Sequence, residues 1–343
     1  MPSSRNNLTE LAARLGLAPS TVSRVLSGKG TAYRIPRLTQ ERVLAAARDS
    51  GIMVNQIARG LRLQKTHTIG VVVPDIANPF FAGLAREIER RAREHGYSIL
   101  LADSQERADI EIDSVQLMRG REVDGLIVAP VGDSAEHLEA AARSGKPLVL
   151  VDRAFAGTDI PTVVADNHGG GLLAVQHLAA AGHRHLACLQ GAPGNEANRE
   201  RVRGYRDGLE ALGLSFQDAQ IVGSAYSVEG GHEAAIQALQ LRPRPTGLVA
   251  LGSLIALGAL SALREAGVRV PEDVSLVSYD EHPWAAVLSP PLTTIAQPVA
   301  EIGRRALDLL LGPPAFAGGG HTRLVLPVSL ISRQSVARPA NLA

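Results

Sequence analysis

The chain has 343 residues, of which 45% are hydrophobic but only 3% aromatic, so it is long enough for two or three domains with aliphatic cores. Its net charge of +1 hides an asymmetry: residues 1–62 carry ten Lys or Arg against three Asp or Glu, and the other 281 carry 25 against 31. A basic segment joined to an acidic body is typical of a nucleic-acid-binding module fused to a domain with another role.

Two further observations limit the class of protein. The single cysteine, Cys188, excludes an internal disulfide framework, and its apolar neighbours predict a buried strand. No stretch approaches the ~20 apolar residues of a membrane span, and the first residues lack the apolar core of a signal peptide. We therefore expect a cytoplasmic protein without a membrane partner.

The basic head has the pattern of three short helices. Apolar residues recur at helical spacing over 8–15, Gly16 interrupts the pattern, and a second helix is predicted from Pro19 to about Ser27. A third amphipathic helix, from Thr39 to about Arg48, would complete a small core.

The second of these helices turns a short polar set outward: Ser20, Thr21, Ser23 and Arg24. Such side chains fit a major groove, where an arginine forks onto guanine and hydroxyls reach phosphates or base edges. From the spacing alone, an ordinary helical pair without a DNA role is an equal alternative.

From Thr68 onward, short β-branched runs alternate with amphipathic helical segments, which predicts parallel sheets covered on both faces. The predicted strands are 69–73, 98–102, 125–129, 147–151, 185–189, 247–252 and 274–279. The predicted helices between them are 80–94, 109–119, 135–144, 168–181, 197–211, 229–240 and 254–266. Because the pattern restarts after about residue 185, we expect two similar α/β lobes with a cleft between them.

Polar and aromatic side chains follow several of these strands, where ligands bind in open parallel sheets. They are Asp75, Asn78, Phe80, Phe81, Asp152, Arg153, Arg201 and Asp280. Carboxylates and arginines fork onto neighbouring hydroxyls, and an aromatic face stacks on a sugar ring, so the set suits a polyol. Structural roles remain open as alternatives. Asp75 and Asp280 would then cap a helix or turn, and one of the two phenylalanines would belong to the core. Asp152 and Arg153 would form a structural ion pair. Asp166 is expected to cap a helix.

The runs LTELAARLGLAPSTVSRVLSGKG, TQERVLAAARDSGIMVNQIARGLR and THTIGVVVPDIANPFF closely resemble the lactose/galactose repressor (LacI/GalR) family of bacterial transcription regulators. The resemblance extends over nearly the whole chain. It implies an all-α helix-turn-helix DNA-binding head plus an α/β, two-lobed, periplasmic-binding-protein-like (type I) effector domain with parallel sheets. Further matching runs lie in the body, among them VDR, NRERVRGYRDGL and VPEDVSLVSYDE.

The resemblance also assigns roles in DNA binding. Pro19, Ser20 and Arg24 match positions that read bases, and Thr21 and Ser23 match positions that contact phosphates. Asn55 to Arg62 matches a hinge that folds on operator DNA, where Leu61, beside Ala58, would wedge into the minor groove. The alternative for Leu61 is a plain linker residue. The segment Gly28 to Ile35 is longer than in lactose-type members and is similar to that of the fructose-type members.

In the body, the resemblance places these residues at effector-lining positions: Asn78, Phe80, Asp152, Arg153, Arg201, Tyr226, Asp280 and Gln297. With Asp75 they form the predicted effector site. Ser253 departs from the family, since many members have Asp or Asn there. Because Arg153 and Arg201 both lie near the cleft, an anionic effector such as a sugar phosphate or sugar acid is one expectation.

The predicted organisation is a DNA-binding domain at 1–54, a hinge and linker at 55–66 and an effector-binding and dimerisation domain at 67–332. Lobe 1 is expected at about 67–161 plus 293–324, lobe 2 at about 162–290 plus 325–332, and a tail at 333–343. The tail has no heptad pattern, so we expect a homodimer rather than a coiled-coil tetramer. Twofold symmetry would match a pseudo-palindromic, double-stranded operator.

We therefore predict a transcriptional regulator, most often a repressor in this family, controlled by a carbohydrate-related effector, acting at the nucleoid and needing no cofactor or metal. Two alternatives are a solute-binding protein without a DNA role and a sugar-acting enzyme of similar architecture. The chain has no G-x-S-x-G elbow, Walker-type phosphate loop or zinc-spaced His and Cys. His183 and His185 are predicted to be turn and edge residues rather than catalytic ones.

Overall fold

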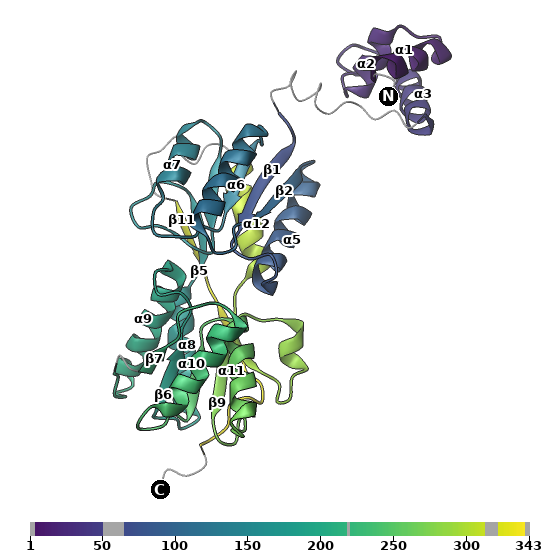
Figure 1. Cartoon of the computed structure of the whole chain (residues 1–343). Helices are drawn as coiled ribbons and strands as arrows, with labels where there is room; N and C mark the ends of the chain where they lie inside the picture. The colour runs from purple at the N-terminus through teal and green to yellow at the C-terminus, as the bar shows by residue number, and fades with distance from the viewer. Residues whose placement is uncertain (1–3, 51–64, 218–219, 313–321, 340–343) are drawn as a thin grey trace. The chain divides into compact units, whose positions relative to one another are not determined.

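The computed structural model describes residues 4–50, 65–217, 220–312 and 322–339. The chain forms two compact units (Figure 1). One, the head, comprises residues 1–68 with 122–124, and the other, the body, comprises residues 69–121 and 125–343.

The head is a three-helix unit around a small aliphatic core. Its helices are α1 (Ser4–Leu15), α2 (Pro19–Leu26) and α3 (Arg37–Asp49). The buried residues are Leu11, Ala12, Val22, Val25, Leu26, Val43 and Ala47. Gly16 lies in the tight turn between α1 and α2 with a φ of +64°. This backbone conformation is easy for glycine and strained for a residue with a Cβ atom. The predicted helices are confirmed, although α1 begins four residues earlier than expected.

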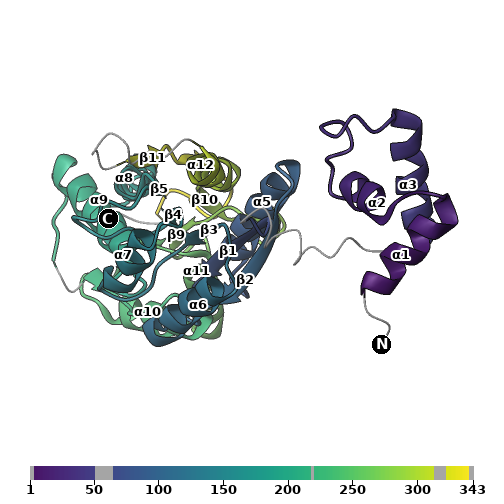
Figure 2. The same cartoon turned by 90° about the horizontal axis from the view of Figure 1, so that it is seen from above.

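The first lobe of the body is a six-stranded parallel sheet in the order β11-β5-β4-β3-β1-β2. Its strands are β1 (Thr68–Val73), β2 (Ser98–Asp103), β3 (Gly125–Val128), β4 (Leu148–Val151), β5 (Thr162–Ala165) and β11 (Arg323–Leu326). Its helices are α5 (Pro79–Glu94), α6 (Ala108–Gly120), α7 (Glu136–Arg143) and α12 (Val299–Leu311). Helices α5 and α12 cover one face and α6 and α7 the other, as the view from above shows (Figure 2).

The second lobe repeats this plan with the order β12-β10-β9-β8-β6-β7, in which only the β10–β12 pair is antiparallel. Its strands are β6 (Leu186–Leu189), β7 (Ile221–Val222), β8 (Gly247–Ala250), β9 (Ser275–Tyr279), β10 (Thr293–Ala296) and β12 (Ser329–Ile331). Its helices are α8 (Asn167–Ala180), α9 (Glu196–Ala211), α10 (Val228–Gln240) and α11 (Ser253–Glu265), with a 3-10 turn at Pro283–Ala286. Helices α8 and α9 cover one face, and α10 and α11 the other.

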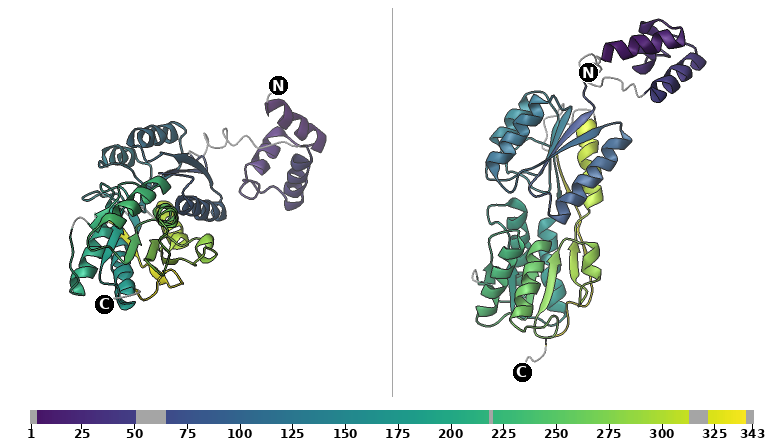
Figure 3. Two further views of the ribbon diagram at one scale, coloured as in Figure 1. Left: turned by 60° about the horizontal axis from the view of Figure 1, so that its bottom comes forward. Right: turned by 45° about the vertical axis from the view of Figure 1, so that its right-hand side comes forward.

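The predicted lobe boundaries are wrong at two strands. Residues 162–165 form β5 of the first sheet, and residues 293–296 form β10 of the second. The chain crosses between the lobes after β5, after β10 and again between β11 and β12 (Figure 3, right). The expected bounds placed the crossings before these two strands, whereas each crossing follows the carboxyl end of the strand.

The separate tail predicted from residue 333 is also wrong over its first residues. Ser335 is buried and donates to the carbonyl of Leu276 at 2.6 Å, while Leu276 N donates to the carbonyl of Ser335 at 2.9 Å. Arg333 forms two hydrogen bonds to Glu281, so this segment belongs to the second lobe. The pairing of β9 with β10 begins at Val277, so the backbone of Leu276 finds its partner in this segment instead.

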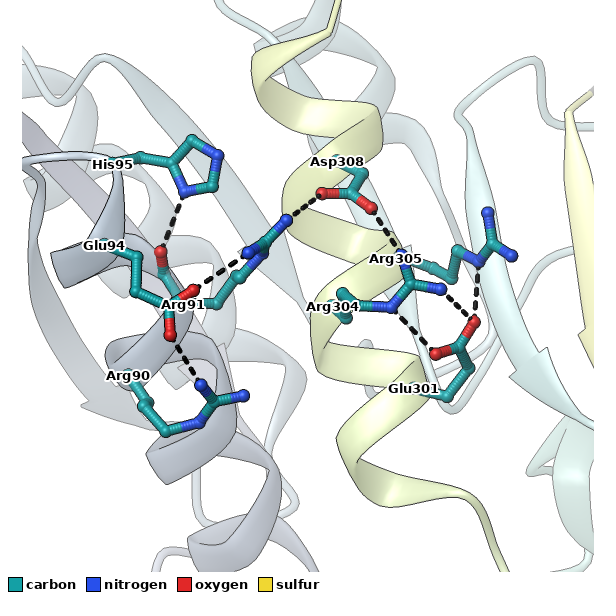
Figure 4. A network of polar contacts seen from close by, with 8 residues as sticks. All are labelled: Arg90, Arg91, Glu94, His95, Glu301, Arg304, Arg305 and Asp308. Atoms are coloured by element: carbon teal, nitrogen blue, oxygen red, sulfur yellow. Dashed lines mark hydrogen bonds and ion pairs between the residues drawn. The ribbon is translucent and has the colours of Figure 1, made fainter.

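An ion-pair network on the surface of the first lobe joins its two neighbouring helices (Figure 4). Arg91 of α5 lies 2.8 Å from Glu94 and 3.4 Å from Asp308 of α12, and Arg304 of α12 lies 3.1 Å from the same Asp308. These side chains are partly exposed, so each pair contributes little, about 0–1 kcal/mol. Beneath them, Ile88 of α5 and Ile302 of α12 are both fully buried in the core of this lobe, and burial of this kind carries the packing of the two helices.

Candidate functional site

The first candidate site is the outer face of α2 in the head. Val22, Val25 and Leu26 are buried, and the exposed residues on the other side of the helix include three of the predicted base readers, Pro19, Ser20 and Arg24. Thr21 and Ser23 are half-buried. The structure therefore gathers all five predicted residues of this helix on one outward-facing surface.

The guanidinium of Arg24 stacks on an aromatic ring. Its Cζ lies 4.2 Å from the ring centroid of Tyr33, which comes from the segment between α2 and α3. Sequence reasoning noted the length of this segment but assigned Tyr33 no role. The predicted hinge residues Asn55, Ala58 and Leu61 lie outside the described residues.

The second candidate site is a small buried pocket at the carboxyl ends of the strands, between the two sheets of the body. Its lining residues are Asn78, Phe80, Phe81, Asp152, Arg153, Asn195, Ala197, Arg201, Tyr226, Asp280 and Gln297. Eight of the nine predicted effector residues are in this set. The pocket measures about 30 Å³, far below the roughly 300–1,000 Å³ of an ordinary ligand site, so a sugar-sized ligand has to displace side chains, part the lobes or extend into neighbouring space.

The ninth predicted residue, Asp75, lies apart from this set. Its carboxylate accepts a hydrogen bond from Ala77 N at 2.8 Å and so closes a turn before α5. Asp75 therefore makes the turn-capping contact and does not line the pocket. Asn78 also caps, accepting from Phe80 N at 3.0 Å, but it lines the pocket as well.

Two aspartates occupy equivalent places in the two lobes. Asp152 follows β4 and donates its backbone N–H to Val163 O at 3.0 Å, and Asp280 follows β9 and donates to Ile295 O at 3.0 Å. Both have positive φ, 64° and 70°, a conformation that strains residues other than glycine and is found at functional sites. Each lobe thus presents one buried carboxylate to the pocket.

The surroundings of the two carboxylates differ. Asp280 accepts from Gln297 Nε2 at 2.7 Å and from Ser253 N at 3.4 Å. Asp152 has its Oδ2 3.7 Å from Arg153 Nε, beyond hydrogen-bond range. Burial raises the pKa of Asp152 to about 6, although Arg153 and Arg201 act in the opposite direction.

Both arginines of the pocket already have partners. Arg153 donates to both oxygens of Glu106, at 2.8 and 2.6 Å; burial works against its charge, but Glu106 holds the pKa of Arg153 above its usual range. Arg201 donates to Asn167 Oδ1 at 2.7 Å and to Leu251 O at 2.8 Å, and it stacks on Tyr279 at 4.2 Å. The predicted Asp152–Arg153 ion pair is therefore weaker than the pair between Arg153 and Glu106.

A larger cavity of about 800 Å³ adjoins the small pocket and shares Arg153, Asn195 and Tyr226 with it. Burial raises the pKa of Tyr226 to about 12, so its hydroxyl is neutral, and it donates to Asn198 Oδ1 at 3.4 Å. A carbohydrate would have room in this cavity, with part of it reaching the small pocket.

Sequence reasoning missed Asn195, Ala197 and Glu106. Asn195 caps α9, accepting from Ala197 N at 2.8 Å, and the Asn-Glu pair before a helical run was a signal that could have singled it out. Glu106 is 47 residues before Arg153, and nothing in the spacing connects the two.

The histidine weighed as a catalytic group is structural. His183 is buried, and its ring contacts Thr246 Oγ1, Ser275 Oγ and Ala337 O, each at 2.9 Å. His183 thus joins three segments of the second lobe. It was predicted to be a turn residue, but it is fully enclosed. Asp166 caps α8, accepting from Gly169 N at 2.8 Å, and Cys188 is buried in β6, as predicted.

Neither a metal site nor a membrane span is found among the described residues. No group of three or more His, Cys, Asp or Glu side chains in residues 4–50, 65–217, 220–312 and 322–339 is arranged to hold a metal ion. Within the same ranges, no helix has the length and apolar character needed to cross a bilayer.

Comparisons with known proteins agree with the sequence resemblance. The profile of periplasmic binding proteins and the sugar binding domain of the LacI family matches residues 66–332. Catabolite control protein A of Priestia megaterium is 33% identical over 302 residues, covering 88% of this chain and 90% of that protein. The HTH-type transcriptional repressor CytR of Escherichia coli is 32% identical over 332 residues, covering 96% and 95%.

Among solved structures, the lac repressor dimer bound to operator and the anti-inducer ONPF matches with a TM-score of 0.81 and 27% identity, covering 95% of this chain and 98% of that one. The fold and these relatives together define the chain as a two-lobed transcriptional regulator with a helix-turn-helix head. The chain belongs to the LacI family.

Proposed function

We propose that this protein is a homodimeric repressor that binds a pseudo-palindromic operator through α2 and responds to a carbohydrate-related effector held between the lobes. The observation that carries the proposal is the outward face of α2, on which Arg24, Ser20 and Pro19 are exposed while the opposite face is buried. Arg24 is the base reader, and Thr21 and Ser23 contact phosphates. Its place of action is the cytoplasm, on the nucleoid.

The hinge completes this proposal. Asn55 to Arg62 folds on the operator, and Leu61, beside Ala58, enters the minor groove, where an apolar wedge kinks DNA. The effector acts by changing the angle between the lobes and therefore the positions from which paired hinges emerge. The coupling between the two sites is no larger than the difference in effector affinity between the two states.

The effector site is proposed to consist of Asn78, Phe80, Asp152, Arg153, Arg201, Tyr226, Asp280 and Gln297. These side chains come from both lobes and enclose one pocket, so a ligand that contacts all of them links the lobes. Asp75 is left out of this set because its carboxylate closes a turn.

The DNA-binding role is tested with the full-length protein on a library of genomic fragments, followed by titration of a retained fragment. Arg24→Ala is expected to weaken operator binding by about 1–3 kcal/mol and to relax specificity at one base pair. Arg37→Ala is the matched control, because Arg37 is an exposed arginine of the head that lies on α3 and pairs with Glu41. It is expected to leave the preference between matched and mismatched sites unchanged.

Two outcomes would contradict this proposal. One is a wild-type protein that retains no fragment above background at low salt, where phosphate contacts are strongest. The other is an Arg24→Ala variant that distinguishes matched from mismatched operators as well as the wild type does.

A further inference from the structure

The charge of the effector is constrained by the partners that the pocket's arginines already have. Arg153 donates two hydrogen bonds to the carboxylate of Glu106. The backbone of Glu106 is itself held, because Glu106 N donates to Pro74 O at 2.9 Å, and its φ is +53°. Arg201 is held by Asn167 and Leu251. A ligand anion that paired with both Nη atoms of Arg153 would have to displace the Glu106 carboxylate, and at Arg201 it would find Nε and Nη1 already bonded to protein acceptors.

The acceptors of the pocket, in contrast, are incompletely used. Gln297 Oε1 is buried and has no hydrogen-bond partner among the described residues, and Gln297 is only 9% exposed. Asp152 is 5% exposed, and its Oδ2 lies 3.7 Å from Arg153. A buried acceptor without a donor is costly, so Gln297 Oε1 favours a ligand that brings an O–H or N–H group, and the Asp152 carboxylate offers such a ligand a second acceptor.

The balance of ionised groups agrees with this. The small pocket sets the carboxylates of Asp152 and Asp280 against two guanidinium groups, and Glu106, paired with Arg153, adds a third carboxylate. The adjoining cavity adds Asp133, Glu136, Glu139 and Glu196 against Arg199, so the two spaces together carry a surplus of negative charge. A phosphate would add up to two more negative charges to a place shielded from water, where repulsion between like charges is strong.

We propose that the effector of this pocket is an uncharged or positively charged molecule with several hydroxyl or amino donors, such as a polyol or an amino sugar, and that sugar phosphates and sugar acids are excluded. This rests on the proposed function, in which the pocket is the effector site. It replaces the expectation of an anionic effector drawn from Arg153 and Arg201, because the neighbours of those arginines, Glu106 and Asn167, decide what they can bind.

The test uses inorganic phosphate and ribose 5-phosphate as anion probes on the full-length protein, with melting temperature as the readout. Millimolar concentrations of either are expected to stabilise the wild type no more than chloride at matched ionic strength. Glu106→Gln frees Arg153 and is expected to bind phosphate about ten-fold more tightly than the wild type.

Asp109→Asn is the matched control. It also removes a carboxylate that lies within 3.1 Å of an arginine, Arg107, but both side chains are more than half exposed. Freeing an exposed arginine is expected to give no specific phosphate binding.

Tight binding of either anion by the wild type would overturn the proposal. So would a Glu106→Gln variant that gains no affinity for phosphate. Neither result touches operator binding, so failure here is distinguishable from failure of the DNA-binding role.

A second observation, independent of the pocket, concerns the head. Tyr33 lies in a segment ordered by backbone hydrogen bonds, among them Tyr33 N to Lys29 O at 3.1 Å and Ile35 N to Gly30 O at 2.8 Å. Its ring is 52% exposed and therefore is not needed for the core. The face of this ring supports the Arg24 guanidinium at 4.2 Å.

We infer that Tyr33 is a positioning residue for operator recognition. Stacking fixes the plane of a guanidinium and leaves its N–H edges available for the two acceptors of guanine. The inference rests on α2 being the recognition helix. Tyr33→Leu is expected to reduce discrimination at the base pair read by Arg24 about two- to five-fold, and Tyr33→Phe to keep it.

A double-mutant cycle separates positioning from an independent DNA contact. On an Arg24→Ala background, Tyr33→Leu is expected to have no further effect on discrimination. An equal effect with and without Arg24 would refute the inference, as would a Tyr33→Leu protein that discriminates like the wild type. A wild-type protein without any sequence preference would instead refute the DNA-binding role, and this inference with it.

Discussion

Replacing Gly204 with alanine is expected to destabilise the body strongly, because α8 and α9 cross at a glycine. A Cβ atom at Gly204 would lie 1.9 Å from His168 O, and one at Gly171 would lie 2.3 Å from Arg201 O. Both obstacles are backbone atoms, which cannot move aside as a flexible side chain does. Substituting Gly204 therefore forces the two helices apart.

We expect the free energy of unfolding to fall by about 3 kcal/mol, the upper end for an overpacked core. This figure already includes the gain in helix propensity from glycine to alanine. For a body of this size it corresponds to a fall in melting temperature of roughly 6–12 °C. Gly120→Ala is the matched control, because Gly120 lies in α6, has no atom within 4 Å of the added Cβ, and is not in the left-handed region. It is expected to melt at or slightly above the wild-type temperature.

The same crossing also positions the site. Arg201 is on α9 and reaches Asn167 at the start of α8, so the separation of these helices sets the distance between donor and acceptor. Gly204→Ala should therefore weaken effector binding as well as stability. A Gly204→Ala protein that melts like the wild type would show that the close approach of α8 to α9 is not needed.

Several elements could be predicted closely from the sequence because one signal decided them. Strands β1, β3 and β4 are continuous β-branched or aliphatic runs, as strands buried on both faces must be, and the predicted ends all lie within one residue of the observed ones. The outward face of α2 was predicted because its period of apolar residues is unbroken.

Other features depend on contacts that local patterns do not encode. Strands β5 and β10 were assigned to the wrong lobes, because a four-residue run carries no information on which sheet it joins. The Arg153–Glu106 pair joins two loops that are adjacent only because β4 and β2 end at the same edge of the first lobe. The sequence thus located the pocket but left open the partners of its charged groups, and those partners decide which ligand charge it accepts.

Asp152→Asn is expected to stabilise the protein at neutral pH while weakening effector binding. In the folded chain, burial raises the pKa of Asp152 to about 6, against about 3.9 for an unperturbed aspartate. The folded state therefore binds the proton more readily than the unfolded state. Stability from this group is full below about pH 4 and is lost as the pH rises through 6.

Ionised Asp152 thus lowers the free energy of unfolding at pH 7.5 by on the order of 3 kcal/mol, and an asparagine does not carry this penalty. Asparagine also tolerates the φ of +64° at this position. We expect Asp152→Asn to melt above the wild type at pH 7.5 and the difference to shrink toward pH 4. The lost acceptor charge should weaken effector binding about ten-fold or more, since a hydrogen bond to a charged group contributes about 1.5–3 kcal/mol.

Asp280→Asn is the comparison variant. It shows how the melting temperature responds when a buried aspartate that already accepts hydrogen bonds is replaced. The Asp280 carboxylate accepts from Gln297 Nε2 and Ser253 N, so its replacement leaves buried donors with a poorer partner and should lower the melting temperature. The two equivalent aspartates of the lobes are therefore expected to respond in opposite directions to the same substitution. If Asp152→Asn melts below the wild type at pH 7.5, or if its advantage persists at pH 4, the buried charge of Asp152 is not what limits stability.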